Sequence, residues 1–179
     1  MSEPLDALLD GLIRDIPDYP KPGVVFKDIT PLLGDRTAFA ACVDALAAAG
    51  RDVVDGPIDK VVGIEARGFI LAAPVALALG AGFVPVRKVG KLPHDTHAVS
   101  YELEYGEATL EVHRDAFRSG DRVLIVDDVL ATGGTVEATT KLMELCGAEV
   151  AGVALLMALS FLPGRERLAH LPMTVLRTV

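Results

Sequence analysis

Val123 to Thr135 carry the sequence VLIVDDVLATGGT, in which apolar β-formers lead into two acids and a glycine-rich turn. The apolar run Val123–Val126 predicts a strand that is buried on both faces, as in a parallel sheet. A helical pattern follows the turn and includes Val136 and Met143. In open α/β sheets, ligands bind at the carboxyl ends of strands, where a helix N-terminus offers unpaired N–H groups to an anion. The stretch therefore predicts an anion site.

The polar residues of this stretch indicate what the anion belongs to. Gly133 and Gly134 allow the backbone to approach a phosphate closely, because no Cβ stands in the way. Asp127 and Asp128 would repel a phosphate, so we expect them to accept hydrogen bonds from sugar hydroxyls. The stretch lacks both the GxxxxGK[ST] of a Walker loop and the GxGxxG of a dinucleotide site. We interpret it as a site for one phosphate and one ribose, although glycine-rich turns and capping acids also occur without a ligand.

Composition limits the class of protein. The 179 residues suit one domain with a sizeable core. Hydrophobic residues make up 51% and aromatic residues only 5%, which favours helices packed on a parallel sheet. A net charge of −8 argues against nucleic acid as the main partner, but small anionic ligands respond to local charge. Cys42 and Cys146 have no CxxC spacing, so we expect core thiols in a reducing compartment.

The segment Phe69–Val86 carries no charged residue and approaches the length of a membrane span. Pro74, the glycines at 80 and 82, and Pro85 argue against a span, and they predict a helix that ends near Gly80 before a short strand. The N-terminus shows no basic, apolar leader. We therefore expect a cytoplasmic protein with no membrane contact.

The rest of the chain alternates helical and strand patterns, which predicts an α/β architecture. We expect helices over residues 4–14 and 37–49, the second closing at Gly50, and strands over 60–65, 83–87, 148–159 and 174–179. A hairpin is expected from residues 101–105 and 108–113. The prolines of segment 16–30 predict irregular structure, and the polar segment 88–100 is expected to be a mobile loop.

Further candidate residues follow two other strands. Arg67 stands in VVGIEARGF, a second strand–turn–helix pattern, and its planar donors suit a phosphate. Arg87, Lys88 and Lys91 form a local cation cluster that suits a diphosphate. Each set could also be ordinary solvated surface.

Acidic and aromatic residues complete the candidates. Glu102 and Glu104 share one face of an alternating strand, so one of them is a candidate catalytic carboxylate or both simply face solvent. Phe26 could stack on a base or fill the core. His94 and His97 have no third ligand at a fitting spacing, so we reject a zinc site.

Five strings together resemble one family, the adenine phosphoribosyltransferases. They are IRDIPDYPKPGVVFKDIT, VVGIEARGF, FVPVRKVGKLP, YELEYG and VLIVDDVLATGGT, and they occur between residues 13 and 135 in the family's order. The resemblance implies the type I phosphoribosyltransferase fold, an α/β fold in which helices flank a mostly parallel central sheet. It further implies a single domain over residues 1–179, with a small N-terminal hood (1–35), a core (36–179) and a flexible catalytic loop.

The resemblance also implies the reaction. Members transfer 5-phosphoribose from 5-phosphoribosyl diphosphate (PRPP) to adenine, which gives AMP and diphosphate in purine salvage. It implies Mg²⁺ bound with PRPP rather than held directly by protein ligands, and a homodimer with no nucleic-acid partner.

Roles follow for the matching residues. The resemblance assigns the ribose hydroxyls to Asp127 and Asp128, and the 5′-phosphate to Ala131, Thr132, Gly133, Gly134 and Thr135. It assigns the diphosphate to Arg67, Arg87, Lys88 and Lys91. Arg87 would reach across the dimer interface, and the loop of Arg67 would contain a cis peptide at Glu65–Ala66.

The base and the catalytic groups are assigned in the same way. The resemblance has Phe26 stack on adenine while the backbone of Val25 and Lys27 reads its edge, although many relatives have arginine at position 27. It makes Arg67, Glu104 and Tyr105 catalytic, with Glu104 handling the proton.

Three alternatives stay open. The first is another base, such as xanthine or orotate, against which the Phe26 segment and Ala131 argue; 6-oxopurine transferases of the superfamily typically have aspartate at the position of Ala131. The second is a DNA-binding regulator that senses PRPP, and the third is a nucleotide-binding module without turnover. Glu104, Tyr105 and the cation cluster favour an enzyme over a module that only binds.

Overall fold

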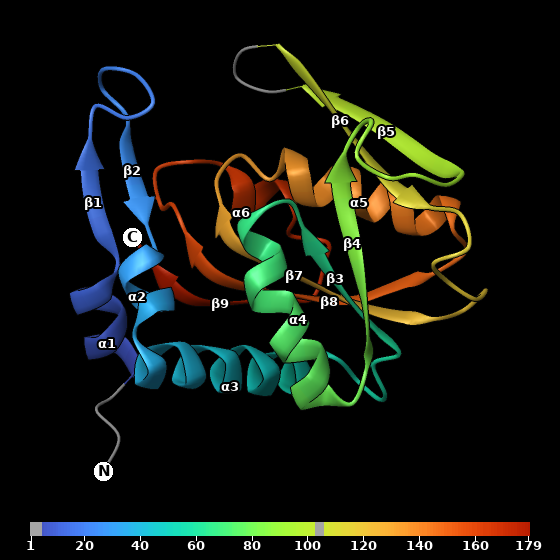
Figure 1. Ribbon diagram of the computed structural model, residues 1–179, viewed down its shortest axis with the longest axis horizontal. Helices are drawn as coiled ribbons and strands as arrows, with labels where there is room; N and C mark the ends of the chain where they lie inside the picture. The colour runs from blue at the N-terminus through green and yellow to red at the C-terminus, as the bar shows by residue number, and fades with distance from the viewer. Residues whose placement is uncertain (1–4, 103–105) are drawn as a thin grey trace. The chain divides into compact units, whose positions relative to one another are not determined.

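The computed structural model describes residues 5–102 and 106–179, and its chain divides into two compact units, residues 1–45 and 46–179 (Figure 1). The first unit contains α1 (Leu5–Leu12), β1 (Arg14–Pro17), β2 (Val25–Asp28), α2 (Thr30–Gly34) and the beginning of α3 (Arg36–Val53). β1 and β2 pair as an antiparallel hairpin in the segment for which the prolines predicted irregular structure. The hairpin tolerates them because Pro17 ends a strand while Pro20 and Pro22 lie in the connection.

Asp28 fixes the end of this hairpin. Its carboxylate accepts hydrogen bonds from the backbone N–H of Thr30 at 2.9 Å and from Arg14 at 2.6 Å. The Thr30 N–H, followed by Arg14, lowers the pKa of Asp28 to about 2. The carboxylate is therefore ionised at neutral pH, and it holds both strands of the hairpin at one end.

The second unit is built on a seven-stranded sheet of order β5-β6-β4-β3-β7-β8-β9. Its strands are β3 (Lys60–Ile64), β4 (Gly82–Lys88), β5 (Thr96–Glu102), β6 (Glu107–His113), β7 (Arg122–Leu130), β8 (Glu149–Ala158) and β9 (Met173–Thr178). The helices of this unit are α4 (Arg67–Leu79), α5 (Gly134–Leu145) and the short α6 (Gly164–Arg167). Five strands are parallel and β5 and β6 are antiparallel, which confirms a mostly parallel sheet flanked by helices.

The topology determines where a ligand can bind. β3 and β7 are parallel neighbours, and their crossovers β3–α4–β4 and β7–α5–β8 leave in opposite directions. Right-handed crossovers therefore place α4 and α5 on opposite faces of the sheet (Figure 1). The carboxyl ends of β3 and β7 flank the point where the winding reverses, which is the usual ligand site of such sheets.

The core confirms the prediction for the central strand. Val123, Leu124, Ile125 and Val126 are fully buried. The uncharged segment Phe69–Val86 forms most of α4 and of β4, as expected from its glycines and prolines. Among the helices of the described residues, none combines the length and the apolar character that crossing a membrane requires.

Besides the hairpin β1–β2, three further expectations about the elements were wrong. α3 does not close at Gly50 but continues to Val53, and a Cβ on Gly50 would collide with the side chain of Leu124, so this glycine serves packing. Residues 96–100 are not a loop but part of β5, an edge strand paired with β6, and edge strands are often polar. β7 does not end at the two acids but continues beside β8 to Leu130.

Candidate active site

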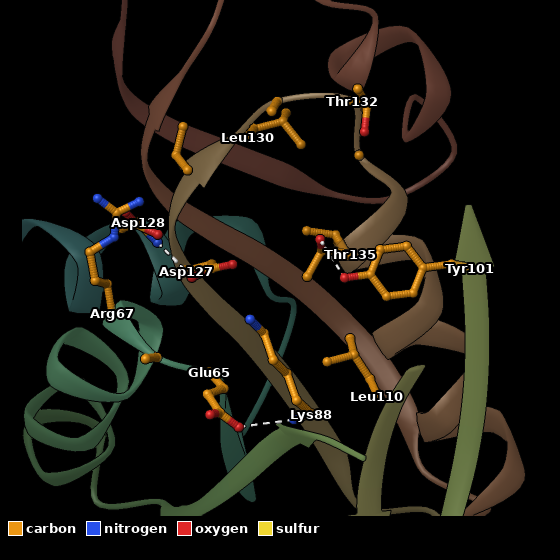
Figure 2. Close-up of a pocket in the computed structure, with 15 residues that line it drawn as sticks. Glu65, Arg67, Lys88, Tyr101, Leu110, Asp127, Asp128, Leu130, Thr132 and Thr135 are labelled. Atoms are coloured by element: carbon orange, nitrogen blue, oxygen red, sulfur yellow. Dashed lines mark hydrogen bonds and ion pairs between the residues drawn. The ribbon is translucent and has the colours of Figure 1, made fainter. Parts of the chain in front are cut away.

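A pocket of about 350 Å³ lies at the carboxyl ends of β3 and β7, between these strands and the first turn of α5 (Figure 2). It contains residues from four of the five strings that carry the resemblance, and Leu110 from β6. The lining residues are Glu65, Ala66, Arg67, Lys88, Tyr101, Leu110, Asp127, Asp128, Val129, Leu130, Ala131, Thr132, Gly133, Thr135 and Val136. The fold thus brings both strand–turn–helix motifs to one cavity, as expected for two motifs that flank the point where the winding of the sheet reverses.

The two acids of β7 form the floor of the pocket. Asp127 is 8% exposed and Asp128 is 4% exposed. Asp127 Oδ1 accepts the backbone N–H of Asp128 at 2.9 Å, and Arg67 Nη2 lies 2.8 Å from Asp128 Oδ2. Burial, and then the charge of Asp128, raise the pKa of Asp127 well above its usual value. Burial also raises the pKa of Asp128, although Arg67 opposes the rise. This pair is suited to accepting hydrogen bonds from hydroxyl groups and unsuited to holding an anion directly.

The raised pKa predicts how stability depends on pH. The folded state holds a proton on Asp127 more tightly than the unfolded chain does, so the free energy of unfolding falls as pH rises from about 3.8 through the raised pKa. Each unit of the rise is worth about 1.4 kcal/mol. In Asp127→Asn we expect a flatter pH profile and a higher stability than wild type at pH 8, measured by urea unfolding between pH 4 and 8. Parallel profiles for the two proteins would contradict this.

The glycine-rich turn between β7 and α5 forms one wall. Gly133 has a φ of +83° and caps α5, and its carbonyl accepts the N–H of Glu137 at 3.0 Å. The backbone N–H groups of a first helical turn have no partner within the helix and can bind an anion. Packing provides a second reason for the glycines, because a Cβ on Gly134 would lie 3.2 Å from the Tyr101 ring.

Gly133→Ala tests this wall, with Gly120→Ala as its matched control. Both glycines have a φ near +85°, but a Cβ at 120 meets no atom within 4 Å, whereas a Cβ at 133 would lie 3.3 Å from Gly164 Cα. Each variant is expected to lose about 1–3 kcal/mol from the left-handed backbone alone. We expect Gly133→Ala to lose more stability than Gly120→Ala, as measured by thermal unfolding. Only Gly133→Ala is expected to bind ribose 5-phosphate more weakly than wild type, as measured by calorimetric titration. Equal behaviour of the two variants would contradict this.

The structure separates the expected diphosphate ligands. Figure 2 shows the Lys88 side chain directed into the pocket, where Arg67 also lies. Arg87 and Lys91 are not among the described residues that line it. Arg87 Nε lies 3.4 Å from Glu65 Oε2, and its Nη1 donates to the Lys91 carbonyl at 3.0 Å. The expected cis peptide at Glu65–Ala66 is present.

The expected base-binding residues belong to β2, in the first unit. Val25 is 46% exposed, and the Phe26 and Tyr19 rings form a T-shaped pair with centroids 5.2 Å apart. Lys27 Nζ donates to both carboxylate oxygens of Asp15, at 2.7 and 2.9 Å. Glu104 and Tyr105 lie outside the described residues, so their roles stay predictions.

Two side chains that the structure places at the turn, Tyr101 and Arg167, received no role in the sequence analysis. Tyr101 lines the pocket, and its phenol oxygen accepts a hydrogen bond from the Thr135 hydroxyl at 3.3 Å. Arg167, on α6, approaches the turn from outside the pocket: its Cδ would lie 3.4 Å from a Cβ on Gly133. Tyr101 could have been found from its position beside the candidate acids. No local motif marks Arg167, since its partner is 30 positions away.

Comparison with known proteins identifies relatives of the whole chain. Residues 33–167 match the phosphoribosyl transferase domain. An adenine phosphoribosyltransferase from Nocardioides is 68% identical over 170 residues, which cover 94% of this chain and 92% of the relative. The crystal structure of adenine phosphoribosyltransferase from Thermoanaerobacter pseudethanolicus has a TM-score of 0.93 at 47% identity and covers 98% of this chain and 100% of that chain. The enzyme from Saccharomyces cerevisiae, solved with an imino-altritol bisphosphate and adenine, has a TM-score of 0.90 at 37% identity, covering 96% and 98% of the two chains.

Proposed function

Because the chain belongs to the adenine phosphoribosyltransferase family, we propose that its pocket at the ends of β3 and β7 is where adenine and PRPP become AMP and diphosphate. Its reaction is the transfer of 5-phosphoribose from PRPP to adenine. The observation that supports this location is the buried pair of Asp127 and Asp128 beside the turn that begins α5. Hydroxyl acceptors and phosphate-binding N–H groups stand next to each other there, as a ribose phosphate requires.

The proposed roles divide the pocket by charge. The turn from Ala131 to Thr135 binds the 5′-phosphate, and the two acids accept the ribose hydroxyls. Loss of diphosphate leaves an oxocarbenium-like ribose and puts negative charge on the leaving group. Arg67 and Lys88 stabilise this charge from the pocket, and a preorganised cation is worth most where water is excluded. Arg87 and Lys91 complete the diphosphate ligands in this proposal.

Magnesium fits this site as part of the substrate complex. Among the described residues, no three His, Cys, Asp or Glu side chains are grouped to hold a metal ion. Mg²⁺ typically keeps several waters and is bound by one or two carboxylates together with substrate phosphates. In this proposal Mg²⁺ is carried by PRPP rather than by protein ligands, and the bound ion would neutralise charge on the diphosphate.

Adenine is the base in this proposal, and residues of β2 are its proposed ligands. Phe26 stacks on the ring, and the backbone of Val25 and Lys27 reads its edge. The Lys27 ammonium is engaged by Asp15, which supports reading by the backbone rather than by the charged group. Attack by adenine N9 releases a proton, and Glu104, with Tyr105 beside it, is the proposed carboxylate that takes it.

A panel of bases tests the activity. Purified protein is incubated with PRPP, Mg²⁺ and one of adenine, hypoxanthine, guanine, xanthine or orotate, and nucleotide formation is measured by chromatography. We expect AMP from adenine and at least about tenfold lower kcat/KM for each other base, a difference of about 1.4 kcal/mol or more. Preferential turnover of another base would overturn the assignment of Ala131 and Phe26. Binding of PRPP without any turnover would favour the sensor or the binding module.

Homodimer formation and a cytoplasmic location are also part of the proposal. Ile70 and Leu77 are two turns apart on α4 and are 44% and 83% exposed, which supports a second copy covering this face. Leu77→Lys is expected to shift the mass measured by light scattering from dimer to monomer. An unchanged mass would place the interface elsewhere. The two free cysteines support a reducing compartment.

A further inference from the structure

The short helix α6 packs directly against the turn that the proposed function assigns to the 5′-phosphate. Gly164 begins α6, and a Cβ there would collide with the Ala131 carbonyl and lie 2.8 Å from the Leu130 side chain. A Cβ on Gly133 would in turn lie 3.3 Å from Gly164 Cα. Figure 1 shows α6 beside the start of α5. The last residue of α6 is therefore held close to the phosphate turn without lining the pocket.

That residue, Arg167, is paired with an acid of the first turn of α5. Arg167 Nε donates to Glu137 Oε2 at 2.6 Å, and its Nη2 forms an ion pair with the same oxygen. The remaining nitrogen, Nη1, would lie 3.6 Å from a Cβ on Gly134. The guanidinium thus lies between the Glu137 carboxylate and the backbone of the turn.

Glu137 carries a negative charge at neutral pH. Burial by itself would raise the pKa of Glu137, but the hydrogen bond and charge of Arg167, assisted by Lys141, lower it. Lys141 Nζ lies 3.4 Å from Glu137 Oε1 and its side chain is 56% exposed, so it is the weaker partner. An acid in the first turn of a helix interacts favourably with the helix dipole. The same negative charge repels an anion that binds to the N–H groups of that turn.

We propose that Arg167 is a positioning residue for the 5′-phosphate. It neutralises the Glu137 carboxylate and supports the turn, so that the first turn of α5 can bind the 5′-phosphate although it already carries this acid. This inference rests on the proposed function of the pocket. It assigns a role in the reaction to the C-terminal part of the chain, in which the sequence shows no motif.

Affinity for ribose 5-phosphate, measured by calorimetric titration, tests the proposal. In Arg167→Ala we expect roughly three- to tenfold weaker binding. Arg167→Lys and the double variant Arg167→Ala/Glu137→Gln are expected to bind within about twofold of wild type. The lysine keeps a positive charge beside Glu137, and the double variant has no negative charge at position 137 to compensate. The defect of Arg167→Ala should shrink at 0.5 M salt, on the order of a 4 Å Debye length. A role in packing alone predicts neither rescue by Glu137→Gln nor salt dependence.

Arg165→Ala is the matched control. Arg165 lies on the same helix and donates to the Thr178 hydroxyl at 3.1 Å, so its removal changes the net charge equally. We expect its affinity to stay within about twofold of wild type. Wild-type affinity in Arg167→Ala, or a double variant as weak as Arg167→Ala, would overturn the proposal. If wild type itself neither binds ribose 5-phosphate nor forms AMP, the proposed function fails instead.

Discussion

Asp128→Ala is expected to lower kcat/KM for PRPP by about 10²- to 10⁴-fold, because a hydrogen bond to a charged group is worth about 1.5–3 kcal/mol and two ribose hydroxyls lose their arrangement. Asp128 is 4% exposed and pairs with Arg67 at 2.8 Å, so its removal also releases the cation proposed to meet the diphosphate. The fold is expected to survive, because the pKa of Asp127 is raised first by burial and then by the charge of Asp128, and the substitution removes that second, repulsive contribution. Steady-state rates at varied PRPP and a thermal unfolding curve provide the two measurements.

The control for this variant lies at the other end of the same strand. Asp121 precedes β7 and accepts the backbone N–H of Arg118 at 2.9 Å, far along the strand from the pocket. Asp121→Asn is expected to keep kcat/KM within about twofold. A kcat/KM for Asp128→Ala within about threefold of wild type would remove this acid from the PRPP site.

Glu104→Gln is expected to lower kcat by about 10²- to 10⁴-fold with little change in the affinity for PRPP, because the variant keeps the shape of the side chain but cannot accept a proton. Single-turnover rates over a range of pH separate this effect from product release. The single-turnover rate of wild type should rise with pH as the carboxylate ionises. The rate of the variant should not show this pH-dependent rise.

Two neighbouring acids serve as comparisons for Glu104. Glu102 ends β5 and Glu107 begins β6, where the two residues are directly paired. Glu107→Gln is expected to retain wild-type kcat. If Glu102→Gln loses the pH-dependent limb and Glu104→Gln keeps it, the proton acceptor is Glu102.

The sequence was sufficient to predict those elements that depend on residues adjacent in the chain. The apolar run of β7, its acids and the glycine turn predicted a central strand, which the structure confirms. They also predicted a ligand site, which stays a prediction, and the pocket is lined by these acids and this turn. Because β3 and β7 are neighbouring parallel strands, Arg67, which follows β3, lies beside Asp128 near the end of β7.

The sequence failed where pairing with distant residues decides the structure. Residues 96–100 look like a loop by composition, yet β6 supplies the backbone partners that make them a strand. Gly50 resembles a helix end, but the neighbouring Leu124 side chain accounts for the glycine. Arg167 and Glu137 are joined only by the fold, which no spacing reveals.

A crystal structure of the chain with AMP decides the assignment of the pocket. The assignment predicts 5′-phosphate oxygens within about 3.2 Å of backbone N–H groups between Ala131 and Thr135, and the ribose hydroxyls on Asp127 and Asp128 at similar distances. The adenine ring should stack on Phe26. A 5′-phosphate bound instead by Arg87 and Lys91, with the ribose away from both acids, would contradict it.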